Sequence, residues 1–477
     1  MPTIGILAAA VFAGFALCMA LPMLVALIEG NWRALEAMFL VSAAYGFLAS
    51  VTILALIARR RTLNRAGVFT AAIVIWLSFV AAATPVFILV EGHSVVGALF
   101  EASSAVTTMG ITLRPLPDIS ASMAFYRATI AWLGGLLTLM MAVYVLGPYR
   151  VGGTPSANLR QVQHARTEED PRFGETLQEI GLPYLALTML CALLLGMTGV
   201  AADDAVVVAM SMLSTNGFVP DRSSSSVLDN GAAETIMVVF MLVGATSIVW
   251  HRLVSSRNFA DSREHSEGVL FLAAVAVLIV AAVLASIVAP PSGLSGIQAA
   301  LNYVFDIVSM VTTTGIAHDT DSGISLPFEL VLLIVFIGGC SYSTAGGIKA
   351  FRVMAMLKHV GNELERLVYP SAILREDAQY DDQHRMIAKS IWSAFFLAVL
   401  TITVGILLFA LQGHALPNAI GLGAGAFSQV GGLVDDAVPG LTQGAVSDGT
   451  LLTIAGLALV ARIEILIVLA AIAGKRW

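Results

Sequence analysis

Long apolar runs separated by short polar segments form the main pattern along this chain. Ten runs are long enough to cross a membrane, and they lie near residues 3–28, 36–58, 68–90, 122–147, 180–202, 232–254, 268–289, 326–357, 387–411 and 450–473. A helix of about 20 apolar residues crosses a hydrocarbon core roughly 30 Å thick. The composition, 58% hydrophobic and only 12% charged, also lies far from that of soluble domains. The pattern therefore predicts an all-α polytopic membrane protein.

Basic residues follow the even-numbered runs. Arg59, Arg60 and Arg61 follow the second run, and Arg150 and Arg160 follow the fourth, whereas the opposite connections are rich in Asp and Glu. Because basic connections stay on the cytoplasmic side, we expect a multi-pass protein with both termini in the cytoplasm. Acidic outer connections would concentrate cations at that surface, although any single carboxylate there is equally typical of a solvated loop.

One short motif that ends in glycine occurs four times. Residues 100–110 align without a gap with residues 305–315, and both segments carry an acid, a serine and two threonines at the same distances before the glycine. Residues 211–217 and 425–431 are weaker copies. Every copy has a hydroxyl residue three positions before its glycine. The four turns comprise Thr107, Thr108, Met109, Gly110, Ser214, Thr215, Asn216, Gly217, Thr312, Thr313, Thr314, Gly315, Ser428, Gln429, Val430 and Gly431.

The motif copies indicate a pore. Each follows an apolar stretch, such as residues 94–106 or 297–311, that is too short to cross a bilayer and is typical of a re-entrant helix. Irregular backbone at membrane depth is tolerated only against protein or a water-filled path, so the four turns should converge on one axis. Their carbonyl groups can then replace part of the hydration shell of an alkali cation. A single Thr-Thr-x-Gly segment is more typical of a helix that ends in a left-handed glycine cap, but four copies favour the filter.

Two acids precede the stronger copies of the motif. For Glu101 and Asp306 we expect hydrogen bonds that hold the turn, in preference to direct contact with an ion.

The run at residues 326–357 is not expected to form one continuous helix. It is longer than the span of about 20 residues that a bilayer requires, and pairs of glycines bracket a stretch rich in Ser and Thr. Such interrupted helices usually line a cavity, although small residues also permit close helix packing. Arg462 lies in the middle of the last run, where a charge facing lipid would cost about 3 kcal/mol or more. We expect it to face the pore or to join a buried ion pair, and its neighbour Glu464 is not assumed to be its partner.

At this point the residues point to a family. The four turns, the segments Trp132–Gly135 and Gly338–Lys349, and the tripeptide Arg462–Glu464 resemble the Trk/Ktr/HKT superfamily of potassium transporters, and within it the Trk-type subunit. The resemblance covers nearly the whole chain and includes two extra spans before the first repeat. It departs from the family pattern at Met109, at residues 428–430 and at Leu137, which puts the strictness of potassium selection over sodium in question.

The resemblance implies a fold and a site. The fold is a channel of four pseudo-symmetric span, pore-loop and span repeats around one pore, beside two leading transmembrane helices. The parts are the leading helices at 1–65 and pore repeats at 66–150, 151–263, 264–358 and 359–477, the third with a broken gate helix. The implied filter is permeable to potassium because all four turns end in glycine. The implied gate residues are Gly338, Gly339, Ser343, Thr344, Gly346, Gly347, Lys349 and Arg462.

The resemblance also implies the setting. It implies a bacterial inner membrane, contact with membrane lipid, a homodimer with one pore per subunit, and a cytosolic TrkA-like ring of nucleotide-binding regulatory subunits. K⁺ is the transported ion, with no cofactor in this chain and no nucleic-acid partner.

Several functions compete on this basis. A channel-like conduit for potassium uptake is favoured, and a sodium- or proton-coupled potassium symporter and a weakly selective K⁺/Na⁺ conduit remain open. An enzyme is not expected, because motifs such as H-E-x-x-H or G-x-S-x-G are missing from the sequence. A purely structural or receptor protein would give the four glycine turns no purpose.

Overall fold

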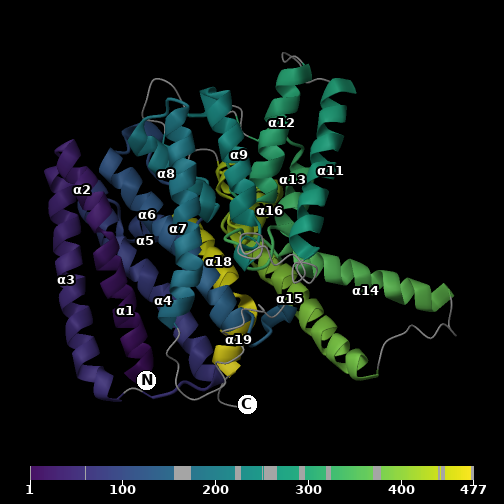
Figure 1. Cartoon of the computed structure of the whole chain (residues 1–477), viewed down its shortest axis with the longest axis horizontal. Coiled ribbons are helices and arrows are strands. Elements are labelled where there is room, and N and C mark those ends of the chain that lie inside the picture. Colours follow the sequence, from purple (N-terminus) through teal and green to yellow (C-terminus); the bar gives the residue numbers. More distant parts are fainter. Residues whose placement is uncertain are drawn as a thin grey trace.

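The computed structural model describes residues 2–59, 61–154, 173–220, 227–249, 251, 266–288, 296–318, 324–368, 378–438, 441 and 446–473. Every regular element in these ranges is a helix, and most of them run roughly side by side in a thick bundle (Figure 1). By length and composition, seven of the described helices can cross a membrane, or eight when one bent pair is counted as a span. The prediction of an all-α polytopic membrane protein is therefore confirmed.

Seven of the ten predicted spans are long helices. The first joins α1 (Pro2–Cys18) to α2 (Ala20–Glu29). The others are α3 (Trp32–Leu56), α4 (Arg65–Val86) with the π turn η2 (Phe87–Glu91), α6 (Ala121–Met141) with the π turn η4 (Ala142–Leu146), α7 (Phe173–Met197), α11 (Ser266–Val288) and α15 (Ala378–Leu411). Short 3₁₀ turns are η1 (Ile57–Arg59), η3 (Leu116–Asp118), η5 (Val151–Gly153) and η7 (Val227–Asp229).

The predicted span at residues 232–254 is not one continuous helix. Helix α9 (Gly231–Ala245) stops after 15 residues, and residues 250 and 252–265 lie outside the described part of the chain. The carbonyls of Gly244 and Ala245 accept hydrogen bonds from the backbone N–H groups of Thr344 and Cys340, at 3.3 and 2.9 Å. A helix can end at membrane depth here because another backbone satisfies its last carbonyls.

The last predicted span, at residues 450–473, is also not one helix. Helices α18 (Asp448–Ile463) and α19 (Ile465–Ala473) meet at an angle of 84°. The bend lies at Glu464, whose φ of 74° is in the left-handed region, and its carboxylate lies 2.8 Å from Arg352 Nη2. An ion pair to another helix thus holds a backbone conformation that the sequence pattern does not favour.

The run at residues 326–357 is broken, as expected. Helix α13 (Phe328–Ile337) is followed by twelve irregular residues, 338–349, and then by α14 (Ala350–Val368). Helix α14 projects sideways from the bundle (Figure 1).

Four short helices lie inside the bundle. They are α5 (Val95–Val106), α8 (Ala202–Ser214), α12 (Gly296–Val311) and α16 (Leu416–Ser428), with α17 (Gly431–Ala437) directly after the last of them. At 12 to 16 residues they are too short to cross a bilayer. Long stretches of α5 and α16 are buried on all sides, so the hydrophobic pattern of these helices reflects protein contacts and not lipid.

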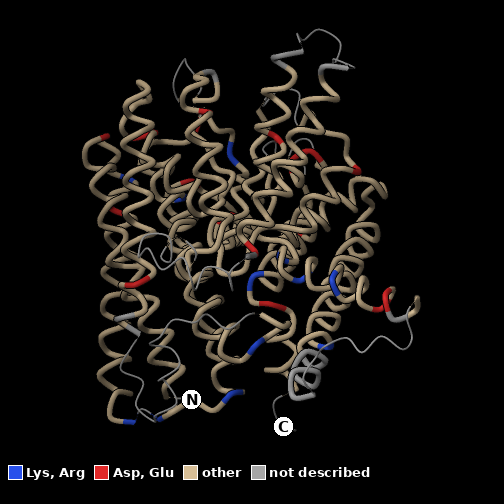
Figure 2. The backbone as a smooth tube through the Cα atoms, turned by 45° about the vertical axis from the view of Figure 1, so that its right-hand side comes forward, with Lys and Arg blue, Asp and Glu red and all other residues tan. Residues whose placement is uncertain are grey.

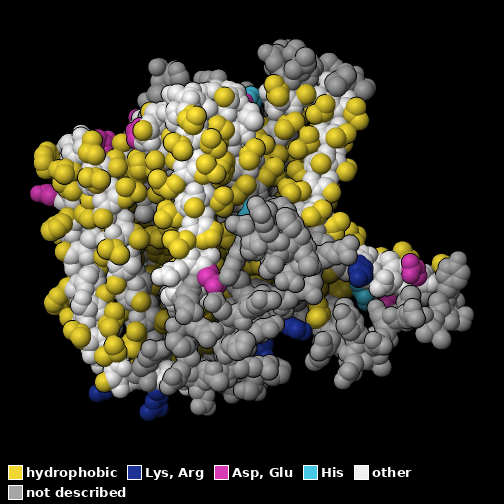
Figure 3. Space-filling view, viewed as in Figure 1, with side chains coloured by type: hydrophobic (Ala, Val, Ile, Leu, Met, Phe, Trp, Pro, Cys, Tyr) yellow, Lys and Arg dark blue, Asp and Glu magenta, His cyan; other side chains and the backbone are white. Residues whose placement is uncertain are grey.

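The two leading spans pack on the next part of the chain. Helix α1 contacts α3 and α4, and Phe15 of α1 makes edge-on ring contacts with Phe79 and Tyr126. These helices form one edge of the molecule, coloured purple in Figure 1. Hydrophobic side chains cover much of the flank seen in Figure 3, as expected for a surface in lipid. Figure 2 shows many Lys and Arg residues toward the end where both termini lie.

Candidate functional site

The four glycine turns share one backbone feature just before the glycine. The residue two positions before each glycine has a left-handed φ, and these residues are Thr108 (62°), Thr215 (51°), Thr313 (58°) and Gln429 (57°). The next N–H donates to a carbonyl five residues earlier, from Met109 to Ser104, Asn216 to Ser211, Thr314 to Ser309 and Val430 to Gly425, at 2.8–2.9 Å. This is the 6→1 bond of a Schellman helix end.

In every turn a left-handed φ falls on a residue other than glycine, and Gly110 and Gly315 also have positive φ, at 80° and 78°, so these turns are not plain glycine caps. In three turns the left-handed residue before the glycine is a threonine, a β-branched residue that rarely adopts this conformation. Such strain persists only where surrounding structure imposes it, and it concentrates at functional sites.

The four glycines form a closed ring. A Cβ added to Gly110 would lie 2.6 Å from Gly217 N, and one added to Gly315 would lie 2.9 Å from Gly431 N. A Cβ on Gly217 would collide with Thr314 O, and one on Gly431 would collide with Met109 O. Each turn therefore abuts the next, and the fourth abuts the first. Segments far apart in the sequence surround one common axis, with no room for a side chain at any of the four positions.

Glu101 and Asp306 hold the chain that leaves two of the turns. Glu101 Oε1 accepts from Leu113 N at 2.6 Å and from the Thr112 hydroxyl at 2.8 Å. Asp306 accepts from the backbone N–H groups of His318 and Ser325, both at 2.9 Å. Both acids are buried. These contacts favour the hydrogen-bonding role over direct contact with an ion that passes through the ring.

Replacing Glu101 by alanine should destabilise the fold. Arg127 Nη2 lies 3.1 Å from Glu101 Oε2, so the change removes one of the carboxylates that balance this buried positive charge. It also removes the acceptor of the Leu113 N–H group. We expect a loss of about 3–5 kcal/mol, seen as a lower melting temperature of the purified protein in detergent. Glu36→Ala, at an exposed position of α3, is the control. Equal melting temperatures for the two variants would contradict this role.

The irregular segment 338–349 contacts the third and fourth turns and the residue just before the second turn. The Thr344 hydroxyl contacts Leu213 O and Gly244 O, each at 3.0 Å. Gly346 N donates to the Thr313 hydroxyl at 2.7 Å, and a Cβ on Gly346 would collide with Ser428 O. Leu213, Thr313 and Ser428 lie four, two and three residues before their ring glycines. The segment therefore crosses the axis on one side of the ring.

Arg462 connects the same segment to the first turn. Its Nε donates to Thr107 O at 2.8 Å, its Nη1 to Thr344 O at 2.7 Å, and its Nη2 to the Thr108 hydroxyl. The side chain is 8% exposed. Within the described part of the chain no carboxylate lies at ion-pair distance from it, whereas Glu464 pairs with Arg352. The alternative of a buried ion pair for Arg462 is thus not supported.

The other predicted gate residues shape or brace the segment. Gly338 and Gly347 have φ of 69° and 76° and pack against each other, and Gly339 faces Ala345 and the Ala245 carbonyl. The Ser343 hydroxyl donates to Cys340 O at 2.6 Å, and Lys349 Nζ donates to Ala345 O at 2.5 Å. These contacts fix a compact loop.

Sequence reasoning missed two residues that anchor this loop. Glu267, at the start of α11, accepts from Ser341 N at 2.6 Å and from the Ser341 hydroxyl. Arg352, three residues after the loop, donates to Gly152 O at 3.1 Å and pairs with Glu464. Glu267 is the acid directly before the apolar run at 268–289, and that position is a signal that could have singled it out.

Known proteins are similar to this chain in sequence and in fold. A family model described as TrkH, cation transport protein, matches residues 64–419. The Trk system potassium uptake protein TrkH of Salmonella typhimurium is 31% identical over 406 residues, which are 82% of this chain and 81% of that protein. The Trk system potassium uptake protein TrkI of Halomonas elongata is 28% identical over 481 residues, 97% and 94% of the two chains. The crystal structure of the potassium transporter TrkH from Vibrio parahaemolyticus matches with a TM-score of 0.85 at 25% identity, covering 100% of this chain and 99% of that one.

Proposed function

This chain belongs to the TrkH family of cation transport proteins, and from that premise we propose that it carries potassium ions into the cell. The relatives are named for potassium uptake, which is transport and not enzymatic catalysis. K⁺ is the substrate, and the family gives no indication of a bound cofactor.

The ring of turns is the proposed selectivity filter. Residues 107–110, 214–217, 312–315 and 428–431 supply backbone carbonyls that replace water around a potassium ion. The observation that carries this proposal is the closed order of the four glycines, since only a shared axis lets each turn abut the next. Each proposed repeat, 66–150, 151–263, 264–358 and 359–477, contributes one turn, and the leading helices at 1–65 stand beside them.

The loop 338–349 with Arg462 is the proposed gate. The loop contacts residues that precede the ring glycines. It ends in Lys349, and its Thr344 carbonyl accepts a hydrogen bond from Arg462, so both basic side chains would face a cation in the pore. A fixed positive charge in a site of low dielectric repels a passing cation strongly. Opening then requires the loop and the guanidinium group to move off the axis.

The proposed cellular location and partners rest on the charge distribution and on the family. The basic residues near both termini support a cytoplasmic location for the two ends and an inner-membrane site. Helix α14 leads directly out of the loop, so a cytosolic TrkA-like ring that docks on the inner segments of a homodimer could act on the gate through it.

Complementation tests the transport function. A bacterium that lacks potassium uptake should grow at low external potassium when it expresses this protein, and not when it expresses Gly315→Asp. Equal rescue by that variant would remove the filter assignment. Single-channel recording separates a channel from a coupled symporter, because flux far above about a million ions per second exceeds conformational cycles of μs to ms.

Replacing Glu267 by alanine should loosen the gate. The change frees the Ser341 N–H and hydroxyl and so removes one anchor of the loop. We expect potassium flux into proteoliposomes, without regulatory partner, to rise several-fold. Glu329→Ala, an exposed acid at the start of α13, should leave the flux as it is. Unchanged or lower flux in folded Glu267→Ala would show that this anchor does not restrain opening.

A further inference from the structure

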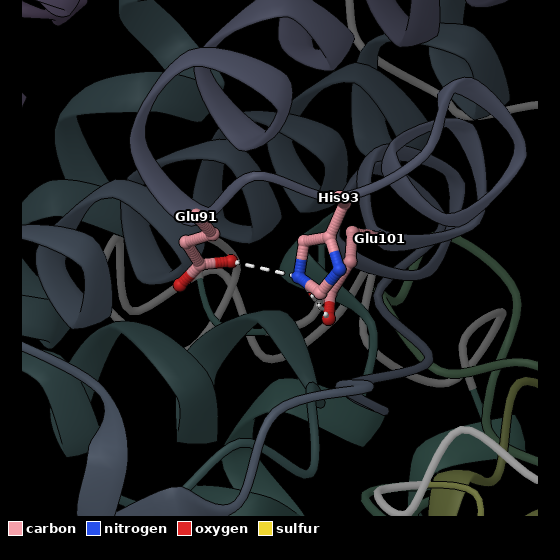
Figure 4. A group of neighbouring side chains, drawn as sticks. All are labelled: Glu91, His93 and Glu101. Carbon is pink, nitrogen blue, oxygen red and sulfur yellow. Dashed lines mark hydrogen bonds and ion pairs between the residues drawn. The ribbon is translucent and has the colours of Figure 1, made fainter.

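A second cluster of charged side chains lies apart from the proposed gate. Glu91 ends η2, His93 follows it, and Glu101 lies on α5. His93 Nε2 is 3.1 Å from Glu91 Oε2 and 3.7 Å from Glu101 Oε1, and the three groups offer ligand atoms that all lie within 4.8 Å of one another (Figure 4). Two carboxylates and an imidazole thus converge on one point.

Other residues orient both carboxylates. Arg127 donates from Nη1 and Nη2 to the two oxygens of Glu91, at 2.8 and 2.7 Å, and from Nε to Glu101 Oε2 at 3.2 Å. Thr112 and Leu113 hold Glu101 Oε1. Metal-binding carboxylates are usually fixed by such outer hydrogen bonds. The oxygens nearest His93 are therefore held in place before any ligand arrives.

The carboxylates of the cluster outnumber the cation that pairs with them by one. Glu91, Glu101 and Arg127 leave a net charge of −1 when the imidazole is neutral, and the nearby Arg114 donates from Nη2 to the backbone carbonyl of Glu91 at 3.0 Å. The side chains of Glu91 and Glu101 are only 4% and 1% exposed, so this charge is poorly solvated. His93, at 16% exposed, provides the access from solvent. An incoming cation would meet an imidazole nitrogen and two carboxylate oxygens.

We propose that Glu91, His93 and Glu101 form a binding site for a divalent transition-metal ion of the zinc class. One nitrogen and two oxygen ligands with the remaining position open to water is a ligand set that zinc accepts. Calcium and magnesium prefer oxygen ligands throughout, so the imidazole disfavours them. The site lies between the third span and the first pore helix, on the outer side in the orientation proposed above.

The site is connected to the first filter turn. Glu101 Oε1 is both a proposed metal ligand and the acceptor for Thr112 and Leu113, which follow Gly110 by two and three residues. A bound metal would compete for this oxygen and would add positive charge near the entrance of the filter. External zinc should therefore reduce potassium flux, an effect that rests on the proposed function.

Titration calorimetry of the purified protein with ZnCl₂ tests binding without any transport. Wild type should bind one zinc ion per chain at this site, and His93→Gln, which keeps a polar side chain beside Glu91, should bind it at least tenfold more weakly. His414→Ala is the matched control, because His414 Nε2 contacts the Thr450 hydroxyl at 2.9 Å and no carboxylate among the described residues forms an ion pair with it. Equal zinc affinity in wild type and His93→Gln would overturn the proposal.

Flux in proteoliposomes tests the connection to the filter. External ZnCl₂ should inhibit wild type and His414→Ala, with each flux taken relative to its own zinc-free value, and should inhibit His93→Gln at least tenfold less potently. Zinc binding that requires His93 but leaves flux unchanged would confirm the site and overturn its link to the filter. A chain that carries no potassium at all would refute the transport function, while the calorimetry would still decide the site.

Discussion

Gly217→Ala should abolish potassium uptake while leaving the protein folded. The added methyl group would collide with Thr314 O of the neighbouring turn. The turns cannot move apart to make room, because each is already in contact with the next. Displacing one carbonyl by even half an ångström changes the coordination that must match the hydration energy of the ion. We expect growth at low potassium to fall to the level of cells without the transporter, and flux in proteoliposomes to fall at least a hundredfold.

Gly456→Ala provides the matched control. This glycine lies in α18, and a Cβ there meets no atom within 4 Å. Both variants should reach the membrane in equal amounts and show similar melting temperatures. Uptake by Gly217→Ala at the wild-type level would mean that the ring does not line the path of the ion.

Arg462→Ala should raise basal potassium flux by one to two orders of magnitude. The guanidinium group makes three hydrogen bonds that tie the loop to the first turn. Hydrogen bonds to charged groups contribute about 1.5–3 kcal/mol each, and every 1.4 kcal/mol changes a population about tenfold. Loss of the bonds and of the charge should favour the open state, as measured by flux into proteoliposomes without a regulatory partner.

Arg462→Lys separates the two contributions. Lysine keeps the positive charge but cannot bridge Thr107, Thr108 and Thr344 at once. Low flux in this variant would assign the effect to charge, and high flux would assign it to the hydrogen bonds. Arg59→Ala, at an exposed position, controls for loss of a basic residue. Unchanged or lower flux in folded Arg462→Ala would contradict a role in closing the pore.

The sequence predicted the long spans well because contact with lipid requires an apolar composition. It did not predict the end of α9 at Ala245 or the bend at Glu464, for a different reason. A helix ends at Ala245 because Cys340 and Thr344 satisfy its carbonyls, and α18 bends because Arg352 pairs with Glu464. Both partners are distant in sequence, so no local pattern contains them.

The candidate site was predictable in position but not in detail. The spacing of hydroxyl and glycine residues located all four turns. The left-handed conformation of Thr108 was not predictable, since a β-branched residue disfavours it and only the surrounding structure imposes it. Arg462 was expected to face the interior on energetic grounds, but its contacts with Thr107 and Thr344 depend on the fold. Glu267 was missed because its partner, Ser341, lies 74 residues away.

The loop 338–349 comes from only one of the four quadrants. A pore made of four identical chains must close symmetrically, and in such a pore each mutation occurs in all four subunits. In this chain the proposed gate is a single loop, so one substitution in it would change closure while the other three proposed repeats keep their sequence. On this proposal, a substitution in one repeat could change closure without changing the filter residues of the others.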